Sequence, residues 1–103
     1  MISDPREIET MLISQKNLEI RKTISDFDRR IEHMHAEFTR YLNGSTRKMP
    51  EWEKLETDLT IFSRTNFVKI DVAISSQLDR VLYKFQNRKK IWLSRAKEMH
   101  EGA

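Results

Sequence analysis

The sequence predicts an all-α protein, and three observations lead to that prediction. The 103 residues include only two glycines and two prolines, and 34% of them are charged, a composition typical of long helices with little turn structure. The β-branched residues do not alternate with a period of two over any long run, so no sheet is expected. The third observation is a regular apolar repeat over residues 13–41, with the spacing of a helix that packs against a partner helix.

The apolar repeat moves in steps of three and four residues without a slip once Asn17 is counted as its single polar member. Its apolar members are Ile13, Ile20, Ile24, Phe27, Ile31, Met34, Phe38 and Tyr41. Pro5 suits the first turn of a helix, where its missing N–H costs nothing. Asn43 and Gly44 both tolerate the left-handed conformation in which helices end. We therefore predict a first, coiled-coil-like helix over about 4–43.

A second helical region is predicted over about 50–101, opened by Pro50 after the short polar connection of residues 44–49. Its apolar stripe consists of Trp52, Leu55, Leu59, Phe62, Phe67, Ile70, Ile74 and Val81. A short connection between long helices favours an antiparallel hairpin. The 103 residues are accordingly expected to form a single helical domain.

The two stripes can be paired, because residues that face each other in an antiparallel hairpin have a constant sum of residue numbers. The predicted pairs are Tyr41 with Trp52, Phe38 with Leu55, Met34 with Leu59, Ile31 with Phe62, Phe27 with Phe67, Ile24 with Ile70, Ile20 with Ile74 and Ile13 with Val81. In this register Asn17 faces Gln77, and a buried polar pair of that kind would fix the alignment of the two helices.

The sum of the paired residue numbers is constant up to Phe62 and is one higher from Phe67 onward. The second region therefore carries one extra residue between Phe62 and Phe67. The extra residue falls within 63–66, a run of poor helix formers. We predict a kink, a π-bulge or a break at this point. The pattern leaves two arrangements open, one bent helix or two separate helices, and the second would give three helices in all.

Some apolar residues have no partner in this hairpin, and they fall at its open end. Because 38% hydrophobic residues is lean for a globular core, we predict that two chains meet there as a homodimeric four-helix bundle. The residues predicted at the dimer interface are Ile8, Met11, Leu12, Leu18, Leu82, Phe85 and Trp92.

A basic stretch over residues 80–97 contains no acidic residue. Its cations are Arg80, Lys84, Arg88, Lys89, Lys90, Arg95 and Lys97. One interpretation is a surface that binds nucleic acid or another polyanion through its phosphates. The other is a solvated helix face whose positive charges near the C-terminus suit the helix dipole.

No pattern in the sequence indicates an enzyme, a cofactor or a metal site. Glu32 and His35 have the Glu-x-x-His spacing of di-iron bundles, but such bundles need a second copy of it, and none is present. His33 and His35 are therefore interpreted as surface histidines.

There are no cysteines, which excludes disulfides and fits a reducing compartment. No apolar run of about eighteen residues and no signal peptide is visible, so we expect a cytoplasmic protein.

The second half of the sequence resembles a helical domain that recurs in delta-proteobacterial proteins. The resemblance covers residues 41–102 and depends on a series of positions that occur in the same order. These are Tyr41-Leu42-Asn43-Gly44, Arg47, Pro50, Asn66, Lys84-Phe85, Trp92, Lys97, Met99 and Glu101-Gly102. The sequence departs from the pattern at Leu42, where the family has an aromatic residue, and at His100, where it has a glutamate. The resemblance implies a stand-alone helical module and no particular activity.

The function predicted from the sequence is therefore non-enzymatic. The chain is expected to act in protein–protein interaction as a small adaptor or structural coiled coil that associates with itself. The alternative is a helical nucleic-acid-binding module that uses the basic stretch.

Overall fold

The structure is a computed structural model that describes residues 5–65 and 71–102, with residues 8–14 described as helix but without their side chains. The helices are α1 (Pro5–Leu42), α2 (Trp52–Thr65) and α3 (Val72–Glu101). The described ranges contain no strand, so the predicted all-α fold class is confirmed. Of the two arrangements left open after Pro50, the structure has the one with two separate helices.

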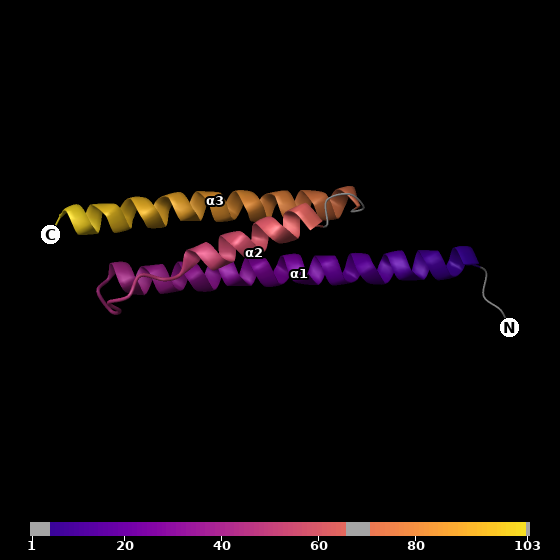
Figure 1. Cartoon of the computed structure of the whole chain (residues 1–103), viewed down its shortest axis with the longest axis horizontal. Helices are drawn as coiled ribbons and strands as arrows, with labels where there is room; N and C mark the ends of the chain where they lie inside the picture. The colour runs from indigo at the N-terminus through magenta and orange to yellow at the C-terminus, as the bar shows by residue number, and fades with distance from the viewer. Residues whose placement is uncertain (1–4, 66–70, 103) are drawn as a thin grey trace.

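Helices α1 and α3 run parallel to each other (Figure 1). Lys84 pairs with Asp28, and Arg88 pairs with Glu32. In both pairs the residue of α3 lies 56 positions after its partner in α1, a constant difference that only parallel helices give. The molecule is consequently a rod with extents of 72 × 21 × 17 Å.

Helix α2 runs antiparallel to α1 and packs against both long helices (Figure 1). Asp58 pairs with Arg30, and the ring of Phe62 lies 5.4 Å from the ring of Phe27, so residue numbers rise in α2 as they fall in α1. The direction is the predicted one, but the partners are displaced by about one helical turn from the predicted register. Helix α2 packs against both long helices and not against α1 alone.

The predicted pairing of α1 with residues beyond α2 is wrong, because α3 runs parallel to α1. Gln77 lines the same surface hollow as Ser25, whereas the antiparallel register placed it opposite Asn17. The predicted partners Phe67 and Ile70 lie outside the described residues. The parallel direction of α3 could not be predicted, because heptad spacing is the same in both directions. The apolar pattern alone cannot distinguish parallel from antiparallel partners.

The second arm of the predicted hairpin is interrupted after Thr65, inside the predicted window of residues 63–66; residue 66 lies outside the described residues. Helix α2 continues through Thr65, and the hydroxyls of Ser63 and Thr65 donate to backbone carbonyls of the preceding turn. Helix α3 then begins with Asp71 as its N-cap. The carboxylate of Asp71 accepts a hydrogen bond from the backbone N–H of Ala73 at 3.1 Å, which satisfies an orphan donor of the first turn.

The end of α1 is formed by a hydrogen-bonded turn around Gly44. The N–H of Ser45 donates to the carbonyl of Arg40, and the N–H of Gly44 donates to the carbonyl of Tyr41. This pair of bonds is a Schellman motif, which needs a residue in the left-handed conformation. Gly44 provides it with a φ of +80°.

Replacing Gly44 with alanine is expected to lower the free energy of unfolding by about 1–2 kcal/mol, the cost of a left-handed alanine. No atom lies within 4 Å of the Cβ that the substitution would add, so the backbone conformation alone sets this cost. Urea unfolding followed by circular dichroism measures it. Gly44→Asn should cost less, because asparagine tolerates this conformation, and Gly102→Ala is the control at a glycine with φ of −79°.

The core is a single apolar seam that runs along the three helices. Its buried members are Ile20, Ile24, Phe27, Ile31, Phe38 and Tyr41 of α1, Leu55 and Leu59 of α2, and Ile74, Leu78, Val81, Phe85, Trp92 and Ala96 of α3. The seam predicted for α1 is therefore confirmed from Ile20 onward, with Met34 half-buried; the side chain of Ile13 is not among those described. In α3 the residues assigned to the hairpin stripe, Ile74 and Val81, share one buried face with Phe85 and Trp92, which the predicted hairpin left without partners.

Trp92 is the centre of the core near the C-terminal end of α1. Its ring stacks on Phe38 at 4.9 Å with an angle of 5° between the planes, and Phe85 meets its edge at 6.3 Å. Only 1% of the residue is exposed. Stacked and edge-to-face aromatic pairs add to the energy of simple burial, so this cluster fixes α3 against α1.

Candidate functional site

The basic stretch of α3 is partly neutralised by carboxylates of α1. The Nζ atom of Lys84 lies 2.8 Å from Asp28 Oδ1 and 2.5 Å from Glu32 Oε1, and Arg88 Nη2 lies 3.2 Å from the same Glu32 oxygen. The hydrogen bond from Lys84 lowers the pKa of Glu32, and hydrogen bonds to Asp28 and Glu32 raise the pKa of Lys84. These charges therefore hold α3 in register with α1.

Another cation of the stretch, Lys89, points toward α2 instead. Its Nζ atom lies 2.6 Å from Glu56 Oε2 and 4.7 Å from the centre of the Trp52 ring. Lys84 and Lys89 thus contact different helices, so the seven predicted polyanion-binding residues do not form one continuous face. Three of them, these two and Arg88, serve the packing of the three helices.

The other four cations, Arg80, Lys90, Arg95 and Lys97, are exposed. Arg80 donates to the backbone carbonyl of Ser76 at 3.4 Å, and Lys97 lies 3.8 Å from Glu101 of the next turn. Ion pairs at such exposed positions contribute little to stability. The positive charge still available to a partner is therefore smaller and more scattered than the sequence suggested.

Two of the residues predicted at the dimer interface belong to the core of the chain. Phe85 and Trp92 are each 1% exposed and belong to the core of the chain itself, so their assignment to the interface is wrong. They lacked a partner in the sequence analysis only because α3 was aligned in the wrong direction. Leu82 is half-buried against the core, whereas Leu18 is 69% exposed. The remaining predicted interface residues, Ile8, Met11 and Leu12, have side chains outside the described set.

The interpretation of His35 as a surface histidine is corrected by the structure. Its ring is half-buried beside α3, and its Nδ1 atom accepts a hydrogen bond from Trp92 Nε1 at 3.0 Å. Burial lowers the pKa of His35 below the ordinary value of 6.5, and the positive charge of Arg88 lowers it further. The neutral ring is the form that can accept from the indole, because a protonated ring has no acceptor. No local pattern could have indicated this pair, because its members lie 57 positions apart.

The stability of the fold should therefore fall in mild acid. The folded pKa of His35 lies below the unfolded one, so the unfolded chain binds more protons between the two values. Stability is complete above the ordinary pKa of 6.5 and is lost as the pH falls through the lowered pKa. Urea unfolding between about pH 5 and 8 should show this slope in the wild type and a shallower slope in His35→Gln. His33→Gln is the matched control, since the His33 side chain is 77% exposed, and equal slopes in all three proteins would contradict the assignment.

The described residues contain no group of three or more histidine, aspartate or glutamate side chains that could hold a metal ion. His33 instead lies 3.4 Å from Glu37 on the same helix, and Nε2 of His100 lies 3.0 Å from the hydroxyl of Tyr41. For the described part of the chain, none of the helices has the length and apolar character needed to cross a membrane.

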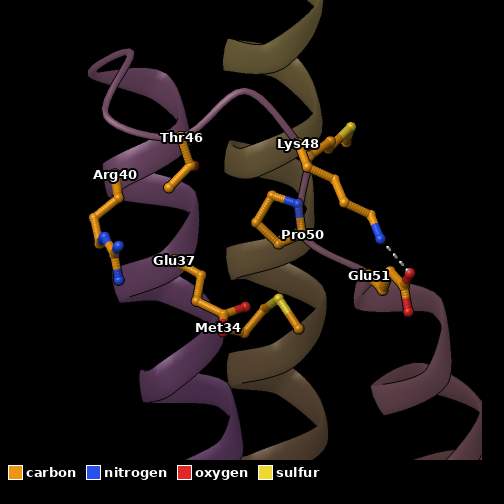
Figure 2. Close-up of a pocket in the computed structure, with 8 residues that line it drawn as sticks. Met34, Glu37, Arg40, Thr46, Lys48, Pro50 and Glu51 are labelled. Carbon is orange, nitrogen blue, oxygen red and sulfur yellow. Dashed lines mark hydrogen bonds and ion pairs between the residues drawn. The ribbon is translucent and has the colours of Figure 1, made fainter.

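A groove runs along the surface between α1 and α2. It consists of two adjoining hollows of about 530 Å³ and 450 Å³ that share Met34, Glu37 and Glu51. The first hollow lies where the chain passes from α1 to α2, and Figure 2 shows Met34 and Pro50 pointing into it, with Glu37, Arg40 and Lys48 around it. The second continues toward the middle of the rod. The groove exists because the nine residues between Leu42 and Trp52 allow α2 to start at a distance from α1.

The N-terminal end of α1 extends beyond the other two helices (Figure 1). With the constant offset of 56 residues, the first residue of α3 lies level with about residue 16 of α1. We call residues 5–15 of α1 the arm. Two large exposed apolar residues lie at its base, Leu18 (69% exposed) and Val72 (80% exposed). The arm is thus a stretch of helix that no other described helix of the chain covers.

Comparisons with known proteins do not extend this description. No protein-family model, no curated protein and no solved structure matches the chain. The resemblance of residues 41–102 to a delta-proteobacterial helical domain accordingly stays a prediction. The candidate functional surface of this chain is defined by its own geometry, namely the arm and the groove.

Proposed function

We propose that the chain is a non-enzymatic helical module that acts in protein–protein interaction, and that it associates with a second copy of itself through the arm. The observation that carries the proposal is the extension of α1 beyond α2 and α3. The proposal keeps the cytoplasmic location, which a composition without cysteine supports.

The arm has the properties of a helix that needs a partner. Most helical stability in proteins comes from the packing of an apolar face against other elements, and no other described helix packs on the arm. Of the residues over 5–18, five are isoleucine, leucine or methionine. Leu18 is 69% exposed at the base of this segment. A second copy that covers this helix would remove the apolar residues from water and stabilise its backbone.

The same observations favour interaction with protein over the alternative of a nucleic-acid-binding module. Lys84, Arg88 and Lys89 are already paired with carboxylates of α1 and α2. A polyanion would have to displace these partners or bind through the scattered charges that remain. A gel-shift experiment with DNA at low salt tests this point, and a shift that weakens steeply with salt would favour the alternative.

The proposed function is tested by the mass of the particle in solution. Sedimentation equilibrium at micromolar concentration should give a dimer for the full chain. A chain that lacks residues 1–15 should give a monomer whose circular dichroism still shows the helices of the bundle, because the arm lies outside it. Tyr83→Ser, at a 70% exposed position of α3, is the control and should remain dimeric. A monomer for the full chain would overturn the proposal.

A further inference from the structure

The geometry points to the groove between α1 and α2 as the site that receives the arm of a second copy. This inference rests on the proposed function, since it names the surface with which the arm pairs. The two copies would lie antiparallel, with each arm in the groove of the other.

The dimensions of the arm and the groove agree. Along α1 the groove extends from Arg29 to Arg40, which is about 18 Å of helix. The residues of the arm span about 16 Å. An arm laid antiparallel along this stretch places residue 10 of one copy level with residue 35 of the other. The relation is the same for both copies, so the contact forms a closed two-fold dimer.

The groove has the chemistry of a site for an amphipathic helix. Half-buried Met34, Met49 and Pro50 supply apolar surface along it, with charged side chains around them. Methionine adapts its shape to a bound helix more readily than branched side chains do. Binding of an amphipathic helix in such a groove is a recurrent mode of recognition.

The charges of the two surfaces are complementary. The groove is lined by five basic residues and two acidic ones. They are Arg29, Arg30, Arg40, Lys48 and Lys54 with Glu37 and Glu51. Arg29, Arg30 and Lys48 are already paired with Asp26, Asp58 and Glu51, so the complementarity depends on Arg40 and Lys54. The arm carries more negative than positive charge, since it contains Glu7, Glu9 and one arginine. Among the described residues, no carboxylate lies within ion-pairing distance of Arg40 or Lys54, so both are available to the arm.

The same antiparallel register brings together two exposed apolar residues that lie far apart within one chain. Leu18 of one copy comes level with residue 27 of the other. Ile61 also lies level with residue 27, since Asp58 is paired with Arg30 and α2 is antiparallel to α1. Leu18 is 69% and Ile61 is 58% exposed. Contact between them across the dimer would remove both from water.

Leu18 and Ile61 also lie on the faces of α1 and α2 that line the groove. Leu18 and Arg29 of the groove are separated by about three helical turns, so they share one face of α1. Ile61 and Lys54 of the groove are separated by about two turns, so they share one face of α2. The groove face therefore continues through Ile61 on one helix and Leu18 on the other.

The test uses two charge substitutions on the full chain, Leu18→Glu and Ile61→Lys. Each alone is expected to abolish the dimer in sedimentation equilibrium at a concentration where the wild type is dimeric, because it places a charge opposite an apolar residue. Both positions are exposed, so circular dichroism should show unchanged helix content.

An equimolar mixture of the two variants should recover the dimer. One of its two symmetric contacts then pairs the introduced glutamate of one copy with the introduced lysine of the other, and the second contact keeps the original leucine and isoleucine. Tyr83→Glu is the control at an exposed position of α3 and should remain dimeric.

The outcomes separate this inference from the proposed function. A monomeric wild type would overturn both. A wild type that is dimeric, with variants that are still dimeric or a mixture that stays monomeric, would overturn the groove as the receiving site and leave self-association standing. Loss in each variant and recovery in the mixture is the result that the geometry requires.

Discussion

Replacing Trp92 with alanine is expected to lower the free energy of unfolding by about 3–5 kcal/mol, the usual cost of removing a fully buried tryptophan. The ring is 1% exposed and stacks on Phe38 at 4.9 Å. Its loss would leave a cavity between α1 and α3 and remove the hydrogen bond to His35. A domain of this size is stable by only about 5–15 kcal/mol, so a large part of its stability would disappear. Urea unfolding followed by circular dichroism measures the change.

Two further variants show which property of Trp92 matters. Trp92→Phe keeps an aromatic ring but removes the indole N–H, so it should cost less than the alanine variant and reduce the pH dependence contributed by His35. Tyr83→Ala is the control for loss of an aromatic side chain on the same helix, because Tyr83 is 70% exposed. Its effect should stay within about 0.5 kcal/mol. Equal losses for Trp92→Ala and Tyr83→Ala would contradict the position of Trp92 in the core.

Replacing Lys84 with glutamate is expected to cost about 2 kcal/mol. The substitution removes two ion pairs and places a third carboxylate beside Asp28 and Glu32. The side chain of Lys84 is 30% exposed, so water screens the repulsion in part and keeps the cost moderate. The loss should shrink in high salt, because salt screens charges that are near the surface.

The matched second substitution, Glu32→Lys, turns this prediction into a test of topology. Parallel α1 and α3 place residues 32 and 84 side by side, so the double variant should recover part of the stability that each single variant loses. In the antiparallel hairpin predicted from the sequence the two residues would be far apart, and their effects would simply add. Lys90→Glu, at an exposed position with no carboxylate partner in the described part of the chain, is the control for reversal of charge.

Properties that depend on residues close together in the chain could be predicted from the sequence. The seam from Ile20 to Tyr41 is periodic, so its burial could be predicted from spacing. The left-handed turn at Gly44 could be predicted for a similar reason, since few other residues adopt that conformation. Both predictions depend on local geometry that any packing of the helix would preserve.

Properties that depend on how distant helices are aligned could not be predicted from the sequence. The spacing of apolar residues in α3 fits a parallel or an antiparallel partner equally well, and nothing within the helix favours one direction. The wrong direction for α3 also led to wrong assignments for individual side chains. Trp92 was assigned to a dimer interface, Lys84 to a polyanion site and His35 to the surface, although each has its partner on another helix more than fifty positions away.

The parallel direction of α1 and α3 also determines where the two ends of the described chain lie. A hairpin would bring residues 5 and 102 to the same end, whereas here they lie toward opposite ends of a rod 72 Å long (Figure 1). Any protein joined to the chain at one end would be held several nanometres from one joined at the other. The distance between two proteins attached in this way would be set by the lengths of α1 and α3.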